Sequence, residues 1–123
     1  MTSREIENTQ RETCAKYCAL YAGVSGDMML GFAISTKGRT PVNGLRHPPE
    51  GDFSGWYLWC GEEFSDDADF FAPFHAYHVY QDYPEVVGLL GLPPGYRFLI
   101  AGKWVDVWYD ESLVHVPSER NAS

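Results

Sequence analysis

Apolar and polar positions divide the first half of the chain into short segments. Residues 1–12 are mostly polar and predict a leader that is frayed or forms a short helix. Apolar residues then cluster, and we expect a first strand at about 17–22 and a turn or short helix over 24–30. Residues 31–36 are β-compatible. The Gly- and Pro-rich residues 37–54 predict a long surface loop.

The second half carries clearer periodicity. Residues 55–60 (GWYLWC) predict a strand with aromatic side chains on both faces. After an acidic loop over 61–69, rings at three-residue spacing predict a helix over about 73–80. A second short helix is expected to begin at Pro84 and to end at Gly91.

The C-terminal apolar residues predict a β-hairpin. Segments 96–101 and 104–109 flank Gly102 and Lys103, which suit a two-residue turn that opens with glycine. Side chains alternate along the second segment, so its two faces carry different sets. One face holds Trp104, Asp106 and Trp108, and the other holds Val105, Val107 and Tyr109.

These elements predict an α+β fold: an antiparallel sheet of four to six strands with two short helices packed on one face. The domain is expected over 13–116, between the leader 1–12 and a polar tail 117–123. Trp56 and Trp59 are three apart on one strand and therefore point to opposite faces. Helices can cover one face, so one of these indoles should be exposed or covered by a loop.

Charge narrows the classes of partner. The chain has a formal charge of −8, and residues 48–123 hold thirteen acidic side chains against three basic ones. A strongly negative region repels phosphate backbones, so nucleic-acid binding through it is excluded. The same field attracts cationic partners and speeds their encounter.

Neither a catalytic motif nor a cofactor or metal motif stands out. The acidic loop lacks the ligand spacing of a calcium loop, and the nucleophile-elbow, phosphate-loop and dinucleotide motifs are absent. His75 and His78 are three residues apart on the expected helix, where they could share a face. A small metal-dependent hydrolase built on these histidines is therefore one alternative. A Cys60 thiol acting with either histidine is a weaker one.

Cysteine count and the N-terminal sequence favour the cytoplasm. Cys14, Cys18 and Cys60 make an odd, low count, which suits a reducing compartment. The first dozen residues do not resemble a secretory signal, and the chain has no apolar run long enough to cross a bilayer. We expect a cytoplasmic protein that does not act on membranes.

Three segments in one register resemble a known family. They read GWYLWCGE, DFFAPFHAYH and GLLGLPPGYRFLIAGKWVDVWYDESL. This order is similar to a bacterial immunity-protein family of polymorphic toxin systems, the thirty-third numbered immunity group. The resemblance covers residues 55–114 well and 17–36 loosely, and 37–54 has no place in it. It implies a non-enzymatic cytosolic protein that binds a cognate toxin and blocks it, and it transfers no ligand residues.

Composition is consistent with that role. Toxin sites that bind nucleic acid are basic, so a basic toxin is the expected partner. Indoles beside carboxylates are typical of a hot spot within a polar rim. An interaction module unrelated to toxins remains a further alternative. The predicted partner-binding residues are Trp59, Glu62, Glu63, Asp66, Asp67, Asp69, Asp106, Trp108, Asp110 and Glu111.

Overall fold

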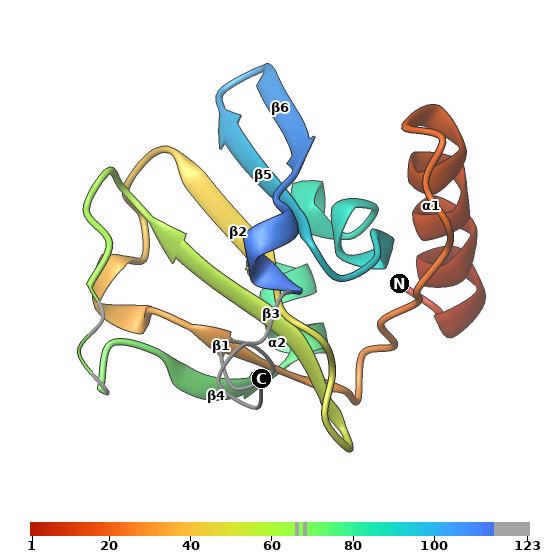
Figure 1. Cartoon of the computed structure of the whole chain (residues 1–123). Helices are drawn as coiled ribbons and strands as arrows, with labels where there is room; N and C mark the ends of the chain where they lie inside the picture. Colours follow the sequence, from red (N-terminus) through yellow and green to blue (C-terminus); the bar gives the residue numbers. More distant parts are fainter. Residues whose placement is uncertain (66, 68, 115–123) are drawn as a thin grey trace, which may run out of the picture.

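The computed structural model describes residues 1–65, 67 and 69–114 (Figure 1). Its architecture is α+β, as predicted. Along the described chain the elements are α1 (Ser3–Lys16), β1 (Met29–Phe32), η1 (Ile34–Thr36), β2 (Val42–Arg46), β3 (Phe53–Cys60), β4 (Ala72–His75), α2 (Ala76–Asp82), η2 (Pro84–Val86), η3 (Leu89–Gly91), β5 (Tyr96–Ala101), β6 (Trp104–Tyr109) and η4 (Glu111–Leu113), where η denotes a 3-10 helix.

The strands form one six-stranded sheet in the order β4-β1-β3-β2-β5-β6. The sheet is mixed rather than antiparallel throughout, because β1 and β3 are parallel. The other neighbouring pairs are antiparallel, as expected. The chain reverses direction twice between β1 and β3, once into β2 and once out of it, and β1 and β3 therefore point the same way.

One face of the sheet, which we call the rear face, carries the main core. Helix α2 and the 3-10 turns η2 and η3, which replace the two predicted short helices, pack on it, and α1 joins the same core through η3. They lie behind and beside the sheet in Figure 1. The strand side chains buried there are Leu30, Phe32, Val42, Trp56, Leu58, Cys60, Phe98 and Ile100.

Helix α1 occupies most of the expected polar leader and runs across the predicted boundary at residue 12. A capping box starts it: the Glu5 N–H donates to Thr2 Oγ1 (3.1 Å), and the Thr2 N–H donates to Glu5 Oε1 (2.9 Å). Its buried side chains are one per turn, at Ile6, Gln10 and Cys14. Such a narrow stripe, with a polar residue in its middle, gives a weak amphipathic signal. The predicted boundary at 116 lies outside the described residues.

Gln10 is the buried polar residue that joins α1 to the rest of the core. Its Nε2 donates to the Val24 carbonyl (3.0 Å) and the Tyr80 hydroxyl (3.0 Å), and its Oε1 accepts from the Val24 N–H (3.0 Å). The Tyr80 hydroxyl donates to the same Val24 carbonyl (2.8 Å). Burial raises the pKa of Tyr80, so the phenol stays neutral and keeps its proton for this bond.

Close packing of α1 depends on two glycines of the segment it touches. A Cβ at Gly91 would lie 2.5 Å from the Gln10 Cβ, and one at Gly88 would overlap Thr13 Oγ1. Larger residues at either position would hold α1 away from the core.

The predicted loop over 37–54 is wrong, because it contains β2, a central strand. Arg46 ends β2 and is 2% exposed. Its Nε donates to the Ser54 carbonyl (2.9 Å), and its Nη1 donates to the Ala22 (2.7 Å) and Leu92 (2.8 Å) carbonyls. Burial lowers the pKa of Arg46 to about 10, which leaves the guanidinium charged at neutral pH. These bonds connect β2 to one segment that precedes it in the chain and to two that follow it.

Several other local predictions change. Residues 17–22 form an irregular connection rather than a strand, and Cys18 has a positive φ of 55°. Pro73 lies in edge strand β4, not in a helix, and α2 starts at Ala76. The expected second helix is two 3-10 turns. The strand over 55–60 and the C-terminal hairpin are confirmed.

Candidate binding surface

The face of the sheet opposite the helices, here called the front face, carries most of the predicted site. Residues paired across neighbouring strands project to the same side. One row therefore crosses four strands through Trp59, Asn43, Leu99 and Asp106. The next row contains Tyr57, Leu45, Arg97 and Trp108. The sequence alternation that placed Asp106 and Trp108 on one face of their strand is confirmed.

The β3 side of the front face is covered by an aromatic cluster. Its members, from β3 and from the segment that follows it, are Phe53, Tyr57, Trp59, Phe64, Phe70 and Phe71. Ring centroids lie 5.1 Å apart for Tyr57 and Phe71, 5.0 Å for Trp59 and Phe64, and 4.9 Å for Phe70 and Phe71. Edge-to-face arrangements at these distances are favourable. The segment over 61–71 thus packs onto the sheet through its phenylalanines.

Trp59 lies beneath this segment and is only 6% exposed. The prediction that a loop covers one of the two β3 indoles is therefore confirmed, and Trp56 is buried on the rear face. A partner cannot reach most of the Trp59 ring in this conformation. The accessible ring of the cluster is Phe64, which is 54% exposed.

Gly31 makes room for the cluster. A Cβ at Gly31 would lie 2.8 Å from the Tyr57 Cδ1 and 3.3 Å from the Phe71 Cβ. The absence of a side chain at this position of β1 therefore leaves room for the Tyr57 ring and the Phe71 Cβ. A larger residue would displace the segment that carries Phe71.

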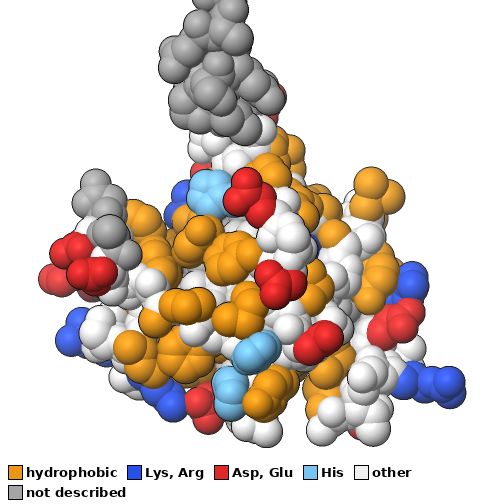
Figure 2. Space-filling model, turned by 90° about the horizontal axis from the view of Figure 1, so that it is seen from below, with side chains coloured by type: hydrophobic (Ala, Val, Ile, Leu, Met, Phe, Trp, Pro, Cys, Tyr) orange, Lys and Arg blue, Asp and Glu red, His pale blue; other side chains and the backbone are white. Residues whose placement is uncertain are grey.

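Acidic side chains border the aromatic cluster. Glu62, Glu63, Asp67 and Asp69 are exposed, whereas Asp66 lies outside the described residues. Asp67 Oδ1 also accepts from the Asp69 N–H (3.0 Å), so Asp67 supports the turn. Seen from below, hydrophobic side chains gather in the middle of the surface, and acidic, basic and histidine side chains lie among and around them (Figure 2). The described carboxylates at 62, 63, 67 and 69 therefore lie next to the aromatic cluster in the chain and are open to solvent.

The β6 side of the front face is a second part of the surface. Trp104 and Trp108 are 69% and 40% exposed, and Asp106 lies exposed between them. The Arg97 guanidinium lies 5.6 Å from the centre of the Trp108 ring and bonds Asp110 Oδ2 through Nη1 (3.1 Å). Arg97 holds the Trp108 ring from its inner side.

Asp110 is a structural residue as well as a predicted contact. Its Oδ1 accepts from the Ser112 hydroxyl (2.6 Å) and the Ser112 N–H (3.0 Å), which caps η4. The Ser112 hydroxyl and the Arg97 guanidinium lower the pKa of Asp110. Glu111 follows it in η4 and is exposed.

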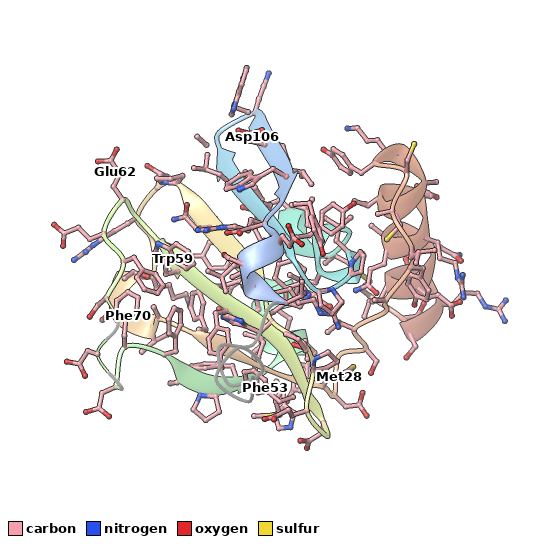
Figure 3. All side chains as sticks on the ribbon, viewed as in Figure 1. Met28, Phe53, Trp59, Glu62, Phe70 and Asp106 are labelled. Atoms are coloured by element: carbon pink, nitrogen blue, oxygen red, sulfur yellow. The ribbon has the colours of Figure 1, made fainter. Side chains whose placement is uncertain are left out.

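The two predicted acidic segments share the front face but are not adjacent. Trp59 and Asp106 lie in one row with β2 and β5 between them, a separation of about 14 Å at ordinary strand spacing. Glu62 projects from the loop after β3, and Asp106 lies on β6 across the sheet (Figure 3). A partner that contacts both must span the face.

The remaining members of this surface were not predicted. Phe53, Tyr57 and Phe64 belong to the cluster, and His47 bonds the Leu113 carbonyl (3.3 Å) so that η4 stays over the face. Phe70 and Phe71 stand out in the sequence only as aromatic residues. Their position depends on the fold of 61–71, for which local periodicity gives no signal.

The histidine pair does not form a metal centre in the described part of the chain. His75 ends β4, His78 lies in α2, and their ring centroids are 6.4 Å apart. They border a shallow hollow together with Asp82. Among the described residues, no three His, Cys, Asp or Glu side chains are grouped closely enough to hold a metal ion. Cys60 points to the rear face and contacts the Tyr83 hydroxyl (3.5 Å).

The family follows from the sequence of the same region. The profile of the Imm33-like domain matches residues 9–110, from the middle of α1 to the end of β6. The chain belongs to the Imm33-like domain family. The match takes in β2, which the sequence reading assigned to a loop. No curated protein and no solved structure matches the chain.

This Imm33-like domain therefore confirms the immunity-protein family that the sequence resembles. In the part of the chain that the structure describes, no helix is both long and apolar enough to span a bilayer.

Proposed function

We propose that this Imm33-like domain is a cytoplasmic, non-enzymatic protein that neutralises a cognate bacterial toxin by binding it through the front face. The observation that supports the proposal is the front face itself. It presents exposed Phe64, Trp104 and Trp108 beside exposed carboxylates, while the α-helices of the described residues lie on the rear side. Aromatic side chains within a polar rim are the composition of protein-binding hot spots.

Charge supports a basic partner. The chain carries −8, and the front-face carboxylates Glu62, Glu63, Asp67 and Asp106 are all exposed. A nuclease toxin binds nucleic acid with basic residues, and an acidic surface is complementary to them. Its field would also speed the encounter, which matters for a protein that must block a toxin before damage accumulates.

The test is co-expression with the toxin encoded beside the chain's own gene. We expect the chain to restore growth to a bacterial host that makes the toxin, and the two proteins to co-purify. If the toxin kills the host regardless and no complex forms at low salt, the proposed function is wrong.

A matched pair of charge reversals locates the site. Asp106→Lys places a positive charge on the front face, and Glu12→Lys makes the same net change on exposed α1. We expect Asp106→Lys to weaken toxin affinity by about tenfold or more and Glu12→Lys by about twofold or less, measured by titration calorimetry. Equal losses in both variants would show that overall charge, not the front face, determines binding.

A further inference from the structure

Strand β6 is an edge strand with unusually large exposed side chains. It ends the sheet order, and only β5 pairs with it in the described part of the chain. Trp104, Val105, Trp108 and Tyr109 are 69%, 45%, 40% and 53% exposed. Edge strands that must stay unpaired usually carry lysine, proline or a bulge, and β6 has none of these between its ends.

The ladder with β5 shows which backbone groups of β6 face outward. Residues that flank a two-residue hairpin turn form a hydrogen-bonded pair, here Ala101 and Trp104. Bonded pairs alternate, so Asp106 and Trp108 also bond β5, and the Asp110 N–H continues the series to the Gly95 carbonyl (2.7 Å). The N–H and C=O groups of Val105, Val107 and Tyr109 therefore point away from the sheet.

The opposite edge of the sheet is protected. Strand β4 has four residues, and its second is Pro73, which has no N–H to offer. A partner strand would gain fewer bonds there. Of the two edges, β6 is the one built to accept another strand.

We propose that the toxin partner adds a strand to the free edge of β6, with a lysine or arginine opposite Asp106 and apolar side chains over Trp104 and Trp108. This inference rests on the proposed function and specifies how the complex forms. Backbone bonds to Val105, Val107 and Tyr109 would supply affinity, and the front-face side chains would supply specificity.

Charge identifies the residue opposite Asp106. Asp106 is exposed, and in the described residues no basic side chain forms an ion pair with it. Because Asp106 bonds β5, it is a non-hydrogen-bonded site toward a strand added outside, where side chains approach most closely. A basic residue there would satisfy the carboxylate.

The same carboxylate disfavours a second copy of the chain as the occupant. Two β6 strands paired about a two-fold axis keep their front faces on one side. Asp106 then lies opposite its own copy, or diagonal to it at about 7–8 Å when the register shifts by one pair. Either register brings like charges together, between molecules that each carry −8.

Amide hydrogen exchange tests the proposal with an internal control. In the free chain, the amides of Val105, Val107 and Tyr109 should exchange fast, and those of Trp104, Asp106 and Trp108 slowly, because only the latter bond β5. Adding the toxin encoded beside the chain's gene should slow the first set by at least about tenfold. If the chain binds the toxin and restores growth while these three amides stay fast, strand addition is wrong and the proposed function stands.

A proline variant separates backbone pairing from side-chain contact. Val105→Pro removes an outward N–H and leaves the β5 ladder intact, while Val105→Ala removes the side chain and keeps the N–H. We expect the proline variant to bind the toxin at least about tenfold more weakly than the alanine variant. Slow exchange of Trp104 and Asp106 amides would confirm that the hairpin still forms.

The remaining outcomes of these two experiments also decide whether a toxin strand pairs with β6. Equal toxin affinity of the two variants would overturn strand addition. Slow exchange at Val105 and Val107 in the free chain, together with a dimer in sedimentation, would assign the edge to a second copy. If no toxin binds the wild-type chain, the proposed function fails and this inference fails with it.

Discussion

Gln10 is a buried side chain whose hydrogen bonds can be removed without removing much volume, and its loss is expected to lower stability. Gln10→Leu leaves the Val24 N–H without its acceptor and the Tyr80 hydroxyl without its donor. Unsatisfied buried groups of this kind cost about 1–3 kcal/mol. Urea denaturation should show that loss, whereas Asn8→Leu on the exposed side of the same helix should change stability by about 0.5 kcal/mol or less. Equal stability of the two variants would contradict the role assigned to Gln10.

Asp110 is a predicted contact residue whose substitution would also affect the folded structure. Asp67 and Asp110 are both predicted contact residues, and a lysine at either position would reverse a charge that a basic partner meets. Asp67→Lys is a less specific test of binding than Asp106→Lys, because the Asp67 carboxylate also holds a turn. Asp110→Lys would disturb the domain itself, because the Asp110 carboxylate bonds Arg97 and caps η4.

The position of a residue could be predicted from sequence where it depends only on neighbouring residues in the chain. Alternation along one strand was enough to put Trp56 and Trp59 on opposite faces. The sequence places Arg46 in the predicted surface loop over 37–54 and gives no sign of its burial. Its acceptors are the carbonyls of Ala22, Ser54 and Leu92. Those atoms are brought together by the fold, and no pattern near Arg46 indicates them.

At the scale of elements, the segment over 61–71 depends on Phe71. The ring contacts Tyr57, Trp59, Phe64 and Phe70, so Phe71→Ala should release the segment and uncover the Trp59 indole. We expect a loss of about 1–3 kcal/mol for this half-buried ring and stronger acrylamide quenching of tryptophan fluorescence. Phe64→Ala is the control, because Phe64 is already 54% exposed and its loss should cost less. Unchanged quenching in Phe71→Ala would refute the covering role.

Elements with a strong local signal were predicted, and elements that depend on distant partners were not. The β5–β6 hairpin and β3 combine a turn or an aromatic run with β propensity. Strand β2 has two turn-forming residues among its five, Asn43 and Gly44, yet it is central because the Phe98 ring fills the space over Gly44. Helix α1 needs the docking surface of η3, and sequence alone does not show that surface.

At the scale of the whole molecule, the charge of −8 predicts association that depends on salt. The rate constant for binding the toxin should fall by about tenfold between low salt and about 0.5 M, because ions screen the field that steers the encounter. The dissociation rate should change less, since it depends on the packed aromatic and backbone contacts. Stopped-flow mixing over a salt series measures both. A salt-independent association rate would exclude electrostatic steering.

Helix α1 also fixes an order of events during synthesis. It leaves the ribosome before the other described elements, yet Gln10 must bond Tyr80, which is 70 residues away. The N-terminal helix therefore waits undocked until most of the chain exists, and contacts this distant slow the final folding step. Strand β6 emerges later still and needs β5 beside it, which in turn needs β2. The edge open to a partner is thus completed last, and a nascent chain cannot be captured there before its core has formed.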